Sequence, residues 1–307
     1  MKLSILTDLK AWIYSGRIMM PLAIVAFLFS LSVLGSYRFF VAGNNFFLRE
    51  EEDAIEQGLY DEYVSAFSKT SDNTLYDNEL LVSDLEKTGS NLHALSPKHA
   101  LSYCMEMGYF FFPFLMTVFG AYTVKADMSS KIMRFRAARE GRWAYFWGKQ
   151  IVLFVLIIGC VIVGIITDFC ISLVTFAGIN KKQVFSLIDI SGNKYPNLGN
   201  NLGQVAFFVF FILLFLELGF SLAFISKSLL IPTVIAIFVF YVMPMYKYSP
   251  LNALTNVFAP LCDFQGIVHF KCIPIDSLSA FSIILLLLII PLFSAVLFNK
   301  FRSMYKF

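Results

Sequence analysis

Charged residues are scarce in this chain of 307 residues, and the common catalytic motifs are missing. Only 15% of the residues are charged, which is less than a soluble domain of this length carries. The sequence holds no G-x-x-x-x-G-K-[ST] phosphate loop, no H-E-x-x-H zinc motif and no G-x-S-x-G nucleophile elbow. Its three His and five Cys show neither catalytic nor zinc-ligand spacing. We therefore expect no catalytic residues, no metal site and no nucleotide-binding site in this chain.

Apolar residues are abundant instead, and they are gathered into blocks. They make up 58% of the chain, with 35 Phe. A helix needs roughly 20 apolar residues to cross a bilayer, and six blocks approach that length, at 18–37, 107–124, 151–176, 204–225, 229–246 and 277–298. The first block is too long for the apolar core of a signal peptide, so we expect it to be retained. The sequence predicts an all-α polytopic membrane protein with six transmembrane helices in a single domain.

The segment 125–149 decides the orientation of these spans. It carries seven Lys and Arg but only two acids, Asp127 and Glu140. Basic segments between spans stay in the cytoplasm, so we expect this segment and both chain termini to be cytoplasmic. A short helix along the inner membrane surface fits its pattern. The apolar stripe and neighbouring bases of that helix are Met128, Ile132, Phe135, Lys131, Arg134 and Arg136.

Residues 1–16 predict a short amphipathic helix that lies on the inner membrane surface before the first span. Its apolar residues recur at helical spacing, at Leu3, Leu6, Leu9 and Ile13. We expect Trp12 and Tyr14 to lie at the level of the lipid headgroups, where aromatic residues are enriched.

A polar insert of about 60 residues, 39–105, is expected outside the cytoplasm as a small helical cap. It carries twelve acids and two bases between Glu50 and Lys87. An apolar step of four predicts one amphipathic helix in it, through Ile55, Leu59, Tyr63 and Phe67. Leu80, Leu81 and Leu85 predict a second, shorter helix. The acidity of the insert could attract a cationic peptide, or it could simply mark a solvated surface.

A second outer segment, 247–276, predicts a helix too short to cross the membrane. Ser249 followed by Pro250 marks the start of this helix. Cys262 and Cys272 lie in the same segment. A disulfide between them and two free thiols are alternative predictions.

Two acidic residues, Asp168 and Glu217, fall inside predicted spans. An ionisable group at membrane depth is costly, so it usually faces protein or a water-filled path. Glu217 lies roughly 12 Å from the inner end of its span. For Glu217, a contact with a substrate or ion and a structural hydrogen bond are equally open. Asp168 lies nearer the outer surface, and a structural hydrogen bond is the favoured interpretation there.

The layout resembles that of the ABC type-2 permease family. The shared features are the interfacial helix, the basic loop with its short helix, a tight turn at 226–228 and a partial helix before the last span. Members of the family show an acidic residue, a short amphipathic run, an Arg and then Gly-Lys at the start of the third span. Asp127, the run 131–136, Arg142 and Gly148-Lys149 occupy those places here.

The resemblance implies a permease subunit without ATPase activity, in a bacterial plasma membrane. It would pair with a second permease subunit, identical or different, and a separate cytoplasmic ATPase would bind ATP and Mg²⁺. Phe135 and Met128 would be buried against that ATPase, with Arg134, Arg136 and Arg139 pairing with its acids. The residues that would couple to the ATPase are Asp127, Met128, Lys131, Ile132, Arg134, Phe135, Arg136 and Arg139.

Members of this family mostly export drugs, lipids, glycans or antimicrobial peptides. The acidic insert favours a cationic amphiphile or peptide as the substrate, and no nucleic acid is expected as a partner. The competing hypothesis is a sensor or receptor subunit, with the insert as ligand domain and the basic segment held by anionic lipid. A secondary transporter would show internal repeats, and none is evident. The missing motifs make an intramembrane enzyme the least favoured class.

Overall fold

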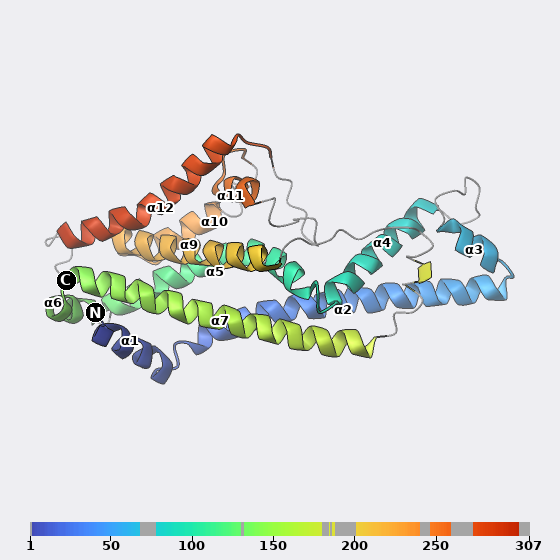
Figure 1. Ribbon diagram of the computed structural model, residues 1–307, viewed down its shortest axis with the longest axis horizontal. Coiled ribbons are helices and arrows are strands. Elements are labelled where there is room, and N and C mark those ends of the chain that lie inside the picture. The colour runs from blue at the N-terminus through green and yellow to red at the C-terminus, as the bar shows by residue number, and fades with distance from the viewer. Residues whose placement is uncertain are drawn as a thin grey trace. The chain divides into compact units, whose positions relative to one another are not determined.

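The structure is a computed structural model that describes residues 2–67, 78–129, 132–179, 184, 186–187, 201–239, 246–258 and 273–300. Every regular element in this part of the chain is a helix (Figure 1). Four of the described helices are long and apolar enough to cross a membrane, over Met19–Glu56, Arg142–Gly178, Gly203–Ser226 and Ser277–Leu297. The prediction of an all-α chain with the helices of a membrane protein is therefore confirmed at this level.

The count of six spans stays a prediction. The expected second span, 107–124, lies within helix α5, Ala100–Ser129. Pro113 falls inside that helix. The expected fifth span, 229–246, is described only in its first part, where α10 covers Leu230–Ile237. A tight turn separates α10 from the preceding helix, as expected, and Lys227 takes a left-handed φ of 57° in it.

The chain divides into two compact units. The first comprises Met1–Ala26, Met105–Val163 and Gly199–Phe307, and the second comprises Phe27–Cys104 and Gly164–Leu198. Three helices contribute residues to both units, namely α2 (Met19–Glu56), α5 and α7 (Arg142–Gly178). The other helices of the first unit are α1 (Lys2–Tyr14), α6 (Ile132–Glu140), α9 (Asn201–Ser226), α10, α11 (Pro250–Phe258) and α12 (Ser277–Lys300).

Two glycines bring α5 and α9 into close contact within the first unit. A Cβ atom added at Gly219 of α9 would lie 1.9 Å from the carbonyl oxygen of Thr117, and one at Gly120 of α5 would lie 2.2 Å from that of Leu216. Small residues let helix backbones approach in this way, which is common between membrane helices. The Thr117 hydroxyl donates to the Phe215 carbonyl across the same contact, at 3.3 Å.

Helix α11 forms the partial helix expected before the last span. The Ser249 hydroxyl caps it by accepting a bond from the Asn252 backbone at 3.1 Å, as the Ser-Pro pair predicts. The side chains of Asn252 and Asn256 each donate to the Ile273 carbonyl at 2.9 Å, which ties the chain before α12 to α11. Cys262 and Cys272 lie outside the described residues, and the described cysteines, Cys104, Cys160 and Cys170, are free thiols.

In the second unit, α2 does not end at the predicted boundary near residue 37. It continues unbroken to Glu56, and at 1.5 Å per residue its length is about 57 Å, well beyond the roughly 30 Å of a hydrocarbon core. Helix α4 (Asn78–Leu95) approaches α2 closely at Gly43. A Cβ at Gly43 would lie 2.2 Å from the Thr88 hydroxyl.

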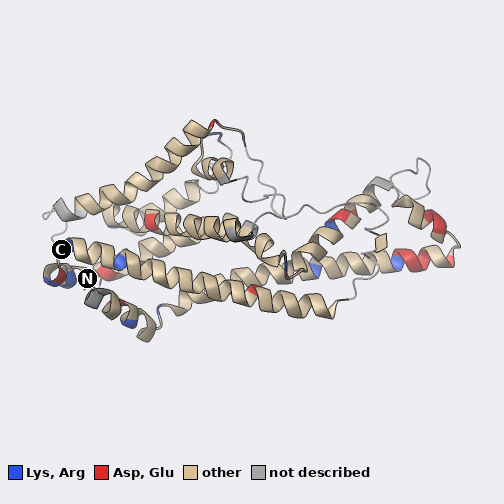
Figure 2. Cartoon of the chain, in the orientation of Figure 1, with Lys and Arg blue, Asp and Glu red and all other residues tan. Residues whose placement is uncertain are grey.

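The acidic insert is helical, but its first helix differs from the prediction. Gly58, with φ 71°, ends α2 and separates Ile55 from the rest of the predicted apolar stripe. Helix α3, Tyr60–Ala66, follows, with Tyr63 buried and Phe67 buried just beyond its end, while Ile55 is exposed. The predicted second helix exists as α4, with Leu81 and Leu85 buried. Acidic side chains gather at the end of α2 and in α3 (Figure 2).

Candidate functional site

The predicted short helix in the basic segment is present as α6, Ile132–Glu140. Gly141, with φ 85°, separates it from α7, and such a left-handed conformation favours glycine. The Gly141 carbonyl accepts the first bond of α7, from the Tyr145 backbone at 3.0 Å. The segment predicted as a loop, 125–149, thus consists of the end of α5, α6 and the start of α7.

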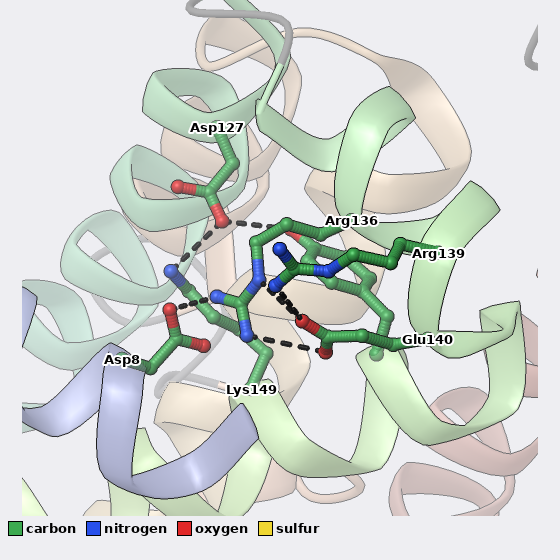
Figure 3. Close-up of polar contacts among 7 residues, drawn as sticks. Asp8, Asp127, Arg136, Arg139, Glu140 and Lys149 are labelled. Atoms are coloured by element: carbon green, nitrogen blue, oxygen red, sulfur yellow. Dashed lines mark hydrogen bonds and ion pairs between the residues drawn. The ribbon is translucent and has the colours of Figure 1, made fainter. Parts of the chain in front are cut away.

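Arg136 of α6 is the centre of a polar cluster that α1, α5, α6 and α7 share (Figure 3). Its guanidinium forms a fork with Glu140, with both nitrogen–oxygen distances at 3.2 Å. A further guanidinium nitrogen pairs with Asp8 of α1. Arg139 also reaches Glu140, at 3.0 Å. Bidentate pairing with a carboxylate is the geometry for which arginine is best suited.

A second ion pair joins the two ends of the basic segment. Lys149 of α7 lies 2.8 Å from Asp127 of α5, with both side chains 4% exposed. The Tyr145 hydroxyl donates to the same carboxylate oxygen at 2.7 Å. These are the first and last positions of the motif on which the family resemblance depends, and the fold brings them into contact.

The N-terminal helix α1 is anchored to this cluster by two side chains on one face. Asp8 and Trp12 are four residues apart and both buried. The Trp12 ring meets Phe119 of α5 edge-on, with centroids 5.9 Å apart, and the Lys149 ammonium lies 5.5 Å from its centroid. Trp12 is thus buried within the chain, whereas Leu6, Ile13 and Tyr14 are exposed, and the expected level of Trp12 and Tyr14 in the membrane stays a prediction.

The pKa values of the Asp8–Arg136 pair follow from burial and from the neighbouring charges. Burial raises the pKa of Asp8 above its ordinary value, although the charges of Lys149 and Arg136 oppose the shift. Burial alone would lower the pKa of Arg136, but hydrogen bonds to Glu140 and the charges of Asp8 and Glu140 outweigh it and raise that pKa. Arg136 is thus held as a cation, and Asp8 gains less from ion pairing than burial costs it.

The outward face of α6 is formed by Phe135, 70% exposed, and Arg139, whose side chain is 74% exposed. Asp127 and Met128 are buried within this chain and do not share that face. Arg136 is half-buried in the cluster. Lys131 and the side chains of Ile132 and Arg134 lie outside what the structure describes. Of the predicted coupling residues, Phe135 and Arg139 are the described side chains available to a partner.

Glu217 lies at a separate polar site of the first unit. Gln150 of α7 donates to its Oε1 atom, and Ser221 donates to the same oxygen at 3.2 Å. Ser294 of α12 donates in turn to Ser221 at 3.1 Å. Glu217 therefore makes the helix-to-helix hydrogen bond that one of its two predicted interpretations requires. These partners could not be named from the sequence, because Gln150 lies at the edge of one apolar block and Ser221 and Ser294 are isolated polar residues within two others.

Asp168 is buried in the second unit, and its Oδ1 has no hydrogen-bond partner within the described part of the chain. The neighbouring hydrogen bond from Ser172 to the Leu95 carbonyl, at 2.6 Å, does not involve it. The structural hydrogen bond favoured for Asp168 is thus not seen at this oxygen.

The same unit holds a pair of histidines that sequence reasoning did not bring together. The rings of His93 and His99 stack with centroids 3.8 Å apart. Burial lowers the pKa of His93 to about 4, helped by His99 and Lys98. The described residues contain no group of three or more side chains arranged to hold a metal ion.

No family model, curated protein or solved structure matches this chain. The resemblance to ABC type-2 permeases therefore stays a prediction, made from the layout and from the residues between Asp127 and Lys149.

Proposed function

We propose that this chain is the transmembrane permease subunit of an ABC transporter, and that a separate cytoplasmic ATPase docks on α6. The observation that carries the proposal is the setting of α6. This short helix lies between two long helices in the sequence and exposes Phe135 and Arg139. Its Arg136 forms an ion pair with Asp8 of α1. A helix fixed in this way can transmit a displacement from a bound partner, because Arg136 contacts Asp8 of α1 and the Tyr145 ring of α7.

Two ion pairs support the proposal that α6 transmits movement of the ATPase to the neighbouring helices. Arg136 connects α6 to α1 through Asp8, and Asp127 connects α5 to α7 through Lys149. Ion pairs shielded from water are costly to break one partner at a time. Displacement of α6 would thus move the neighbouring helices together. In this proposal the chain lies in a bacterial plasma membrane with six spans and both termini inside, and it acts with a second permease subunit.

An exported cationic amphiphile or peptide is the substrate class that the proposal favours. The support is the run of exposed acids at the end of α2 and in α3, including Glu52, Asp53, Glu56, Asp61 and Glu62. Such a surface raises the local concentration of cations. The same surface would also suit a sensor subunit, so the experiment below is chosen to separate the two functions.

The test is affinity purification of the tagged chain from mildly solubilised membranes, with identification of what co-purifies and an assay of ATP hydrolysis. The variant is Phe135→Asp with Arg139→Gln, because both side chains are exposed and their replacement leaves the Arg136 contacts intact. Leu80→Asp on α4 is the matched control, since it places an acid on another exposed apolar position.

We expect an ATPase to co-purify with the wild-type chain and with Leu80→Asp, and to be lost from the α6 variant. If no ATPase co-purifies in several mild detergents, the proposal is wrong. A co-purifying kinase or regulator in its place would favour the sensor function.

A further inference from the structure

Three helices of the first unit meet at the Glu217 carboxyl. Gln150 comes from α7, Ser221 lies one turn further along α9, and Ser294 comes from α12. All four residues are buried, with Ser221 and Ser294 fully so. The four side chains form a continuous chain of hydrogen bonds that joins α7, α9 and α12.

This site is short of one positive charge. Among the described residues, no Lys or Arg forms an ion pair with Glu217. Lys149 directly precedes Gln150 in the chain, but its ammonium lies on Asp127. Gln150 and Ser221 are neutral donors, so they solvate the carboxylate without cancelling its charge. An ionised carboxylate withdrawn from water without a counter-charge is too costly to persist, so it must gain a proton or a cation.

Gln150 gives a second, independent indication of a missing ligand. The residue is 1% exposed, yet its Oε1 has no hydrogen-bond partner in the described part of the chain. A buried acceptor without a donor forfeits its hydration. The side-chain amide can also turn over, since its oxygen and nitrogen occupy nearly the same space. With the oxygen turned towards Glu217, one positive charge between the two groups would satisfy both.

We propose that Glu217, Gln150, Ser221 and Ser294 form a binding site for one small monovalent cation, a proton or an alkali metal ion. A proton would be held as an O–H group on Glu217 and donated to the Gln150 amide oxygen. An alkali ion would take the carboxylate, the amide oxygen and the hydroxyl oxygens as ligands, in the way carbonyl oxygens replace its water in channels. This inference does not rest on the proposed transport function, because the missing charge is a property of the site.

Occupancy of the site would hold α7, α9 and α12 together, which makes binding measurable as stability. The purified chain in lipid nanodiscs would be unfolded by heat in Na⁺, K⁺ or N-methyl-D-glucamine at equal ionic strength. In parallel, infrared spectroscopy would record the carbonyl stretch of protonated carboxylic acids near neutral pH. The variants are Glu217→Gln, which is isosteric and neutral, and Asp168→Asn, which removes a buried carboxyl outside the proposed site and serves as the matched control.

An alkali-ion site predicts a rise in Tm in Na⁺ or K⁺ that is lost in Glu217→Gln and kept in Asp168→Asn. A proton site predicts no difference between cations, together with a protonated-carboxyl band that is lost in Glu217→Gln and kept in Asp168→Asn. Either pattern supports the proposal and identifies the cation. The proposal is overturned if the wild type shows neither response, or if Glu217→Gln retains the response.

A further variant, Gln150→Leu, tests the site even if Glu217→Gln fails to fold. Gln150→Leu keeps the carboxyl and removes the amide oxygen, so it should weaken the alkali response or shift the carboxyl band. An unchanged response in Gln150→Leu would also contradict the site as drawn.

Discussion

Asp127 and Lys149, twenty-two positions apart in the sequence, form an ion pair of 2.8 Å from which water is almost excluded. The pair joins the two helices that flank α6 in the sequence, because Asp127 lies near the end of α5 and Lys149 near the start of α7. The position of α6 is therefore set by contacts on both sides of it as well as by its own Arg136.

Replacement of Asp127 by Asn should destabilise the chain by about 3–5 kcal/mol, because Lys149 would remain buried without its counter-charge. Thermal unfolding in detergent would measure the loss. The double variant Asp127→Asn with Lys149→Met removes both charges and should recover much of the stability. Equal losses in the single and double variants would show that the ion pair does not carry the effect.

Replacement of Asp8 by Asn should cost less than about 2 kcal/mol, since Arg136 keeps its fork with Glu140 and loses one charged partner. The pH dependence provides a sharper test. Because burial raises the pKa of Asp8, its contribution to stability is fully present below the ordinary value of 3.8 and is lost as pH rises through the folded pKa. Stability of Asp8→Asn relative to wild type should therefore improve as pH rises from 4 towards neutrality. A difference that does not change with pH would refute this account.

Acid should destabilise the second unit through His93. Its folded pKa of about 4 lies below the ordinary 6.5, so the unfolded chain binds more protons between these values and stability falls as pH drops through them. The titratable groups near His93 include His99, Lys98 and Tyr103. The Tm of wild type should decline more steeply from pH 6.5 to 4.5 than that of His93→Gln. Parallel declines would mean that the stacked pair does not titrate as described.

A methyl group at Gly219 should force α5 and α9 apart. The added Cβ would meet the Thr117 backbone at 1.9 Å, and backbone cannot move aside as a flexible side chain would. We expect Gly219→Ala to cost about 3 kcal/mol, at the upper end of overpacking losses. Gly159→Ala is the control, since a Cβ there meets nothing within 4 Å. It should be neutral or slightly stabilising in its helix.

Much of the helical framework could be predicted because long apolar blocks and helix-start signals act locally. Helices α9, α11 and α12 show this, with α9 and α12 at the expected apolar blocks and Ser249 capping α11 as the Ser-Pro pair indicates. The length of α2 was missed because the polar sequence after residue 37 looks like a boundary. A helix ends when its backbone geometry changes, however, and here that happens at Gly58.

The polar clusters were harder to predict, because they depend on contacts between residues far apart in the sequence. Asp8 belongs to the helix predicted to lie on the membrane surface, yet it lies against Arg136, 128 positions away. The positive-inside rule counts the bases of segment 125–149 without showing which of them are neutralised. Periodicity likewise identifies Glu217 as unusual but cannot name Gln150 or Ser294, whose approach depends on how α7, α9 and α12 pack.

The burial of Trp12 makes its intrinsic fluorescence a probe of the contacts of α1. Trp12 is 3% exposed and its ring contacts the Phe119 ring and the Lys149 ammonium, whereas Trp143 is 49% exposed. In a chain with Trp143 and Trp147 replaced by Phe, the remaining fluorescence would come from the contact between α1 and its neighbours. Any event that separates α1 from α5 and α7 would change the colour and intensity of that emission, so movement at this junction can be timed without attaching a dye.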